Sequence, residues 1–190
     1  GTHFVPYTRH LGVGAFFEWT PSGGYYWGDQ WINPRGDRRL YVDYQYRRTR
    51  LLDPEVAGAV YDDGEVLEDY GYHQVMASYT EFIPIGWFGL TDHHTLQIDL
   101  EGGWIDRNVM GWDEFIAGGR HPYHWGSGTI GNNVQFSGYE GWSLTGETML
   151  LTNLSYRFPI ARNMNWKVGP SYTESMYLQL FSTIGNLWSY

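Results

Sequence analysis

The sequence contains no cysteine, so it carries neither a disulfide framework nor a thiolate site. Basic residues are also few. The 12 Lys and Arg stand against 21 Asp and Glu, which gives a formal net charge of −9. Because a nucleic-acid backbone is bound by clustered cations, this balance predicts no nucleic-acid partner. No apolar run reaches the roughly 18 residues of a membrane-spanning helix, although a membrane-spanning barrel needs no such run.

Aromatic residues and glycine are abundant instead. Phe, Trp and Tyr make up 18% of the chain, and glycine accounts for 25 of the 190 residues. Glycine in the interior of a helix is destabilising, whereas it suits the turns that connect short strands. The composition therefore predicts an all-β fold.

Several segments alternate apolar and polar residues with a period of two, which is typical of strands. The clearest is 95–104, where Leu96 and Ile98 fall on one face, and Gln97 and Asp99 on the other. The segments that we expect to form strands are 11–19, 39–48, 71–83, 95–104, 111–118, 148–158 and 176–184. The sequence thus predicts about seven strands, with long Gly-rich and acidic connections between them.

Three features favour a transmembrane β-barrel. The polar faces carry charges of both signs along their length, as in a water-filled lumen. Tyr and Trp lie near strand ends, for example Trp19, Trp104 and Trp188, and aromatic girdles mark the edges of membrane barrels. The strands, at about 9–11 residues, match a tilted bilayer span better than the usual soluble strand of about 5–6. The alternative is a soluble, aromatic-rich β-sandwich that binds carbohydrate.

Four sequence blocks in order carry a family resemblance. They are Phe-Ile-Ala-Gly-Gly (115–119), Phe-Ser-Gly-Tyr (136–139), Leu-Ser-Tyr-Arg-Phe-Pro-Ile (154–160) and Leu-Phe-Ser-Thr-Ile-Gly-Asn-Leu-Trp (180–188). This order resembles the C-terminal part of the BamA-like outer-membrane assembly and translocation barrels, the bacterial surface-antigen family. The resemblance covers about 75 residues, and the earlier part of the chain agrees with it in strand pattern only.

The resemblance implies that a long loop, about 119–146, folds back into the lumen. Its tip would be Phe136, Ser137, Gly138 and Tyr139, and the residues that anchor it would be Thr183, Gly185, Asn186 and Arg157. Relatives carry an Arg at the tip and an Asp on the anchoring strand, where this chain has Ser137 and Thr183. Because one lone charge in a confined lumen is costly, the joint loss of both is self-consistent. We expect neutral hydrogen bonds and packing of Tyr139 to hold the loop.

The same resemblance implies a wider context for residues 1–190. We expect them to be part of one barrel domain, with about seven strands of a probable sixteen-strand barrel, and we expect the chain to be incomplete at both ends. The expected partners are outer-membrane lipid, the remaining barrel strands or an N-terminal soluble domain, and a polypeptide substrate. The expected location is the bacterial outer membrane. The implied activity is non-enzymatic polypeptide assembly or translocation, and an alternative role is a structural subunit of a larger outer-membrane complex.

For the other candidate sites, a structural role is the simpler interpretation. Asp92-His93-His94 has no further placed ligands and reads as a polar turn, and the histidines His73, His121 and His124 lack a telling metal-binding spacing. The acidic stretch 62–69 departs from the calcium-loop pattern and reads as a solvated loop. Arg47, Arg48 and Arg50 end a strand, where they would meet lipid phosphate or serve as rim charges. The sequence predicts no cofactor, no metal and no catalytic residue. A lipid-hydrolysing barrel that uses Ser and His is the remaining alternative.

Overall fold

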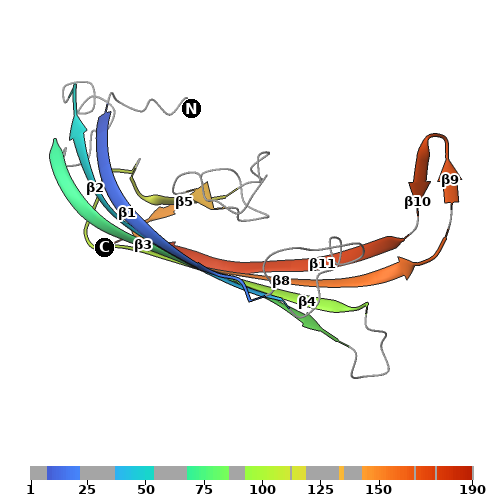
Figure 1. The fold of residues 1–190 in the computed structure, drawn as a ribbon. Coiled ribbons are helices and arrows are strands. Elements are labelled where there is room, and N and C mark those ends of the chain that lie inside the picture. The colour runs from blue at the N-terminus through green and yellow to red at the C-terminus, as the bar shows by residue number, and fades with distance from the viewer. Residues whose placement is uncertain are drawn as a thin grey trace.

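The main element of the structure is a six-stranded antiparallel sheet, seen in a computed structural model that describes residues 8–21, 37–53, 68–85, 93–111, 113–118, 133–134, 143–164, 166–173 and 175–189 (Figure 1). The strands follow the order β1-β2-β3-β4-β8-β11, so each pairs with the next main strand along the chain. They are β1 (Thr8–Trp19), β2 (Arg38–Leu51), β3 (Asp69–Pro84), β4 (Thr95–Ile105), β8 (Thr148–Ala161) and β11 (Met176–Trp188). The predicted antiparallel all-β fold is confirmed.

The sheet has two distinct ends. At one, β4 ends and β8 begins; we call the intervening chain, 106–147, the excursion and this end of the sheet the excursion end. At the other, β8 and β11 are joined through a short hairpin of β9 (Trp166–Val168) and β10 (Ser171–Thr173), and we call it the hairpin end (Figure 1). Gly169 lies in the turn between β9 and β10 with φ 62°, a conformation that glycine adopts without strain. The sequence did not predict this hairpin.

A second, small sheet forms within the excursion. Its strands are β5 (Phe115–Ala117), β6 (Asn133–Val134) and β7 (Leu144–Gly146), in the order β6-β5-β7. Strand β5 pairs parallel to β6 and antiparallel to β7. The predicted segment 111–118 therefore supplies a three-residue strand of this small sheet, and the main sheet has six strands where the sequence predicted about seven in all.

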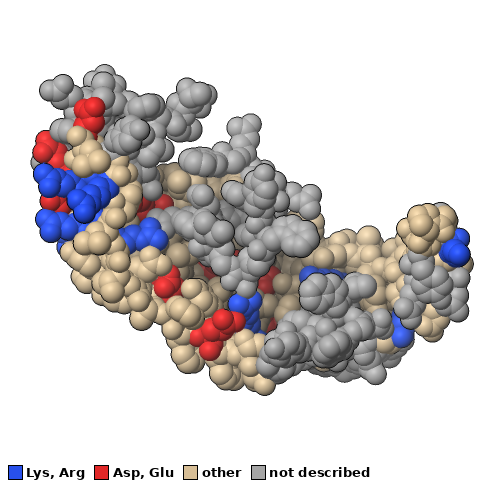
Figure 2. All heavy atoms as spheres, turned by 45° about the horizontal axis from the view of Figure 1, so that its top comes forward, with Lys and Arg blue, Asp and Glu red and all other residues tan. Residues whose placement is uncertain are grey.

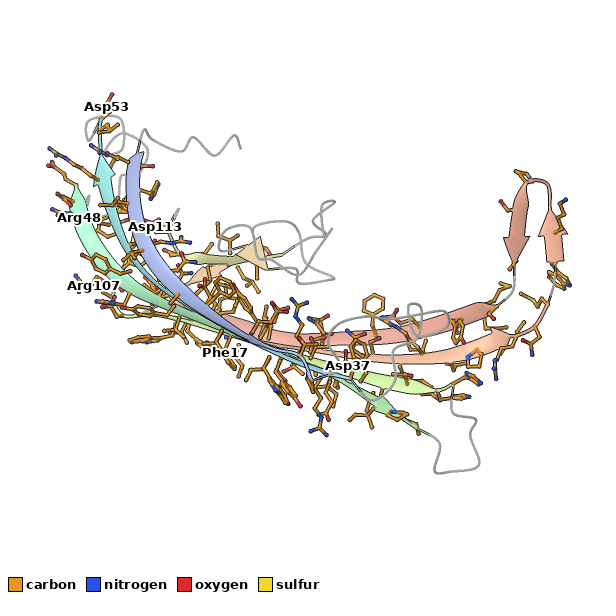
Figure 3. All side chains as sticks on the ribbon, in the orientation of Figure 1. Phe17, Asp37, Arg48, Asp53, Arg107 and Asp113 are labelled. Carbon is orange, nitrogen blue, oxygen red and sulfur yellow. The ribbon has the colours of Figure 1, made fainter. Side chains whose placement is uncertain are left out.

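The two faces of the main sheet differ in chemistry, because cross-strand partners share a face and faces alternate along each strand. The convex face is largely apolar in its middle, and the concave face carries an apolar core near the excursion end and polar side chains further along. Figure 1 shows the small sheet on the concave side. The other, convex face carries Leu40, Val42, Leu96, Ile98 and Leu154, and Leu96 and Ile98 share it as the alternation predicted. Phe17 and the most exposed aliphatic side chains, Leu11 and Val13, belong to it too (Figure 3). Within the described residues no second sheet covers this face, unlike the core of a two-sheet sandwich.

The buried core lies on the concave face, between the main sheet and the small sheet. Its members are Tyr70, Tyr72, Ile105, Val109, Met110, Phe115, Ala117, Met149, Leu151 and Leu187. The ring of Phe115 lies directly over Gly103, where an added Cβ would be 2.6 Å from Phe115 Cζ. A residue without a side chain is thus required on β4 for the excursion to pack this closely against the sheet.

We predict that Gly185→Ala destabilises the protein. A Cβ at Gly185 would lie 2.3 Å from Leu151 Cδ2 and 2.5 Å from the Leu150 carbonyl oxygen, so the β8–β11 pair would have to shift. The expected loss is about 1–3 kcal/mol of unfolding free energy, measured as the urea midpoint at which heat-modifiable gel mobility disappears. Gly102→Ala is the matched control, because the nearest atom to its Cβ is 3.9 Å away. Equal midpoints for the two variants would contradict the prediction.

Candidate functional site: the concave face of the sheet

A hydrogen-bonded network of polar side chains crosses the concave face from β3 to β11. We call it the wall network, and its members are Thr80, Gln97, Asp99, Ser155, Arg157 and Gln179. Asp99 accepts hydrogen bonds from Thr80 Oγ1 (2.8 Å) and Gln97 Nε2 (2.8 Å). Arg157 donates to the Oε1 atoms of Gln97 (2.8 Å) and Gln179 (3.1 Å). Gln179 in turn donates to Ser155 Oγ at 2.6 Å.

The wall network balances its charges through amides. Arg157 and Asp99 are joined through Gln97, which donates to the carboxylate and accepts from the guanidinium. In this half-buried network each polar side chain has a partner, and unpaired polar groups become costly where water is excluded. The charges of Arg157 and Asp99 therefore balance within the wall network, which gives this part of the concave face a polar surface of nearly neutral charge.

The structure separates the residues that the sequence grouped as a loop anchor. Arg157 belongs to the wall network opposite Gln179, and Thr183 lies on the same concave face opposite Asn153. Gly185 also lies on this side, packed against Leu151. Asn186 alternates to the convex face, opposite Leu150. The loop tip Phe136–Tyr139 lies outside the described residues, so its pairing with Thr183 stays a prediction.

Asp113 fixes the excursion to the sheet, and the sequence reading missed it. Its side chain is only 3% exposed and accepts hydrogen bonds from Thr49 Oγ1 (2.8 Å) and from the Tyr70 hydroxyl. His10 Nδ1 lies 3.1 Å from Thr49 Oγ1 and 3.7 Å from Asp113 Oδ1. The carboxylate thus joins the excursion to β1, β2 and β3 (Figure 3). The available signal was an acid inside the apolar stretch 109–117.

Two further carboxyl groups lie beside this contact. Burial raises the pKa of Glu114, the nearby Glu147 carboxyl raises it further, and a hydrogen bond with Thr145 opposes the shift. Glu147 itself is 3% exposed. The raised pKa means that the environment disfavours the charged form of Glu114.

No metal site forms among the residues that the structure describes, where no three His, Asp or Glu side chains gather. His73 Nδ1 hydrogen-bonds Tyr44 Oη (2.7 Å), and His94 Nδ1 hydrogen-bonds Tyr156 Oη (2.6 Å). Asp69, from the acidic stretch, binds Arg48. His121 and His124 lie outside the described residues. A search of the described part of the chain found no helix long and apolar enough to span a membrane.

Comparison with known proteins gives one match. The family profile described as the Omp85 superfamily domain matches residues 37–190, which is most of the chain. Neither the curated proteins nor the solved structures contain a match. The matched region includes β2 to β11, and therefore the wall network and the excursion.

We predict that Asp113→Asn loosens the excursion. The substitution replaces one carboxylate oxygen by an amide NH₂ group, which is a hydrogen-bond donor. At the Oδ2 position this donor would face the hydroxyl donors of Thr49 and Tyr70, so both hydrogen bonds would be lost. The expected loss is about 1–3 kcal/mol, measured as faster hydrogen exchange of the amides of residues 109–117. Glu114→Gln is the control, since it makes the same change at the adjacent residue while the Thr49 and Tyr70 hydrogen bonds go to Asp113, so exchange should stay unchanged. Unchanged exchange in Asp113→Asn would show that the carboxylate does not hold this segment.

Proposed function

Because the chain belongs to the Omp85 superfamily, we propose that it forms part of the barrel wall of a protein that inserts or translocates polypeptide. We also propose that loop 119–146 folds against the concave face of this wall. The superfamily consists of non-enzymatic assembly and translocation barrels that reside in the outer membrane. The chain is thus an outer-membrane β-barrel protein, not a soluble carbohydrate-binding sandwich or a lipid hydrolase. Its specific role within the superfamily is the subject of the proposal.

The observation that carries the proposal is the opposite chemistry of the two faces. The convex face presents Leu11, Val13 and Leu180 at 71%, 70% and 57% exposure, as a lipid-facing surface does. The concave face presents the wall network, where Arg157 and Asp99 are joined by Gln97. A polypeptide that passes along such a wall finds donors and acceptors without a strong electrostatic trap.

The excursion supports the inward position of the loop. Strand β5, just before loop 119–146, and strand β7, at its end, pair with each other on the concave side of the main sheet (Figure 1). The core and Asp113 fix the first part of the excursion to the sheet. We propose that the tip, Phe136–Tyr139, continues across this face and that Ser137 and Thr183 make a neutral contact in place of the family's Arg and Asp.

The two edge strands of the main sheet indicate where further strands of the barrel would pair. Among the described strands, β1 and β11 each pair on one side only. Unpaired strand edges are not tolerated in lipid, because their backbone groups have no water to bind. We propose that further barrel strands pair with β1 and β11 and complete the wall. An N-terminal soluble domain is the other proposed partner.

Disulfide trapping tests the loop position. The chain has no native cysteine, so the double variant Ser137→Cys/Thr183→Cys has no competing thiol. We expect a disulfide to form under mild oxidation in the folded protein, seen as a mobility change that dithiothreitol reverses. The matched control is Ser137→Cys/Ser182→Cys, because Ser182 is adjacent to Thr183 and on the convex face. No disulfide with Thr183, or equal trapping at both positions, would refute the inward loop.

A reconstitution experiment tests the activity. Vesicles that hold the full-length protein receive an unfolded outer-membrane barrel substrate, whose folding is followed by heat-modifiable gel mobility. We expect severalfold faster folding than in vesicles that hold an unrelated barrel of similar size, because a wall with polar and apolar faces offers the substrate a path to the bilayer. Equal rates would contradict polypeptide insertion and would favour the structural-subunit role.

A further inference from the structure

Arginines gather on the convex face at the excursion end. Arg9 of β1 and Arg48 and Arg50 of β2 lie there, and Arg107 follows β4. Figure 2 shows basic side chains concentrated at this end of the sheet, with acidic ones beside them, and Figure 3 shows Arg48 and Arg107 there. In a chain with a formal charge of −9, this is an unusual accumulation of positive charge.

Among the residues that the structure describes, Arg9 and Arg50 are the members of this group that have no carboxylate of their own. They are directly opposite each other in the β1–β2 register, and like charges in that position are destabilising. Arg48 has a partner, since its Nε and Nη2 atoms lie 2.8 and 2.9 Å from the two Asp69 oxygens. Arg107 lies 3.4 Å from Asp106. Within the described residues, no ion pair joins Arg9 or Arg50 to a carboxylate at hydrogen-bond distance. Arg50 is opposite Asp69 in the β2–β3 register, but both oxygens of that carboxylate bind Arg48, so three arginines share one carboxylate.

Below the arginines, an aromatic layer begins on the same face. Tyr44 Oη hydrogen-bonds His73 Nδ1 at 2.7 Å, and the rings of Tyr46 and His73 are 5.0 Å apart. Trp104 on β4 is 45% exposed on this face. On β1, Leu11 is opposite Arg48 and Val13 is opposite Tyr46, and both side chains are exposed. Further along the same face, β2 continues with Val42 and Leu40. The order arginine, aromatic, aliphatic along β2 is the order of headgroup, interface and acyl chain in a bilayer.

The hairpin end of the same strands lacks the imbalance. Arg38, on the convex face of β2, lies 3.0 Å from Glu81, and Arg39 lies 2.8 Å from Glu18. On β1 and β2, the arginines at this end therefore have their own carboxylates, Arg38 on the convex face and Arg39 on the concave face. The excess of cationic groups on these two strands lies at the excursion end.

We propose that Arg9 and Arg50 form a binding site for the phosphate of an anionic membrane lipid in the leaflet at the excursion end. One phosphate between the two guanidinium groups relieves their repulsion and accepts paired hydrogen bonds, a geometry that guanidinium provides. The acyl chains lie along Leu11 and Val13, on the same strand and face as Arg9. The site rests on the outer-membrane location and does not depend on polypeptide translocation.

Lipid titration of the folded full-length protein in detergent, read by native mass spectrometry, tests the site. The probes are phosphatidylglycerol, a neutral glycolipid with the same acyl chains, and inorganic phosphate. We expect tighter binding of phosphatidylglycerol than of the glycolipid, and a loss of roughly tenfold or more in the double variant Arg9→Gln/Arg50→Gln. Arg9→Lys/Arg50→Lys, which keeps the charge, should retain part of the preference and guards against a folding defect.

Arg38→Gln is the matched control, because it removes a cation from the same strand and face at the opposite end. It should leave phosphatidylglycerol binding unchanged. The proposal is overturned if the double Gln variant binds as the parent does, or if Arg38→Gln loses as much. It is equally overturned if millimolar inorganic phosphate displaces the lipid, which would identify a free-anion site.

Discussion

The pleat of the antiparallel sheet is the constraint on which the rest of the structure depends. Successive side chains alternate between faces, so the register of six strands decides which residues meet lipid and which meet the lumen. A slip of one residue in β4 would place Asp99 among Leu40 and Val42 and would put Leu100 into the wall network. The charges on the concave face therefore fix the register as firmly as the apolar residues on the convex face do, because neither set tolerates the other's surroundings.

The concave face also explains where the buried core lies. In a sheet whose convex side faces lipid, packing must come from the chain itself on the inner side, and the excursion supplies it through Phe115 and its neighbours. Gly103 allows Phe115 to approach the sheet closely. Asp113 fixes the position of the excursion on the sheet, since Thr49 and Tyr70 donate hydrogen bonds to it from two strands. The wall network begins beyond this core, so the lumen side is apolar and packed near the excursion end and polar further along.

The sequence predicted those features whose signal lies in neighbouring residues, and it missed those that depend on contacts between distant segments. Alternation in 39–48, 95–104 and 148–158 placed the strands and their faces correctly, because a period of two needs only neighbouring residues. The small sheet depended on pairing between distant segments, so 111–118 was expected to be one more strand of the barrel. Asp113 escaped notice because its partner Thr49 is 64 residues away. The hairpin β9–β10 was missed because three-residue strands show no alternation.

The wall network also bears on how firmly an inward loop can be held. Arg157 already donates to Gln97 and Gln179, so the wall provides its own partners for its cation and needs no carboxylate from the loop. With Ser137 and Thr183 at the positions of the family's ion pair, the contact that we propose exchanges a charge-assisted bond for a neutral one, which is roughly half as strong. A loop held as we propose would detach at lower cost, which suits the polypeptide passage that we propose for this barrel.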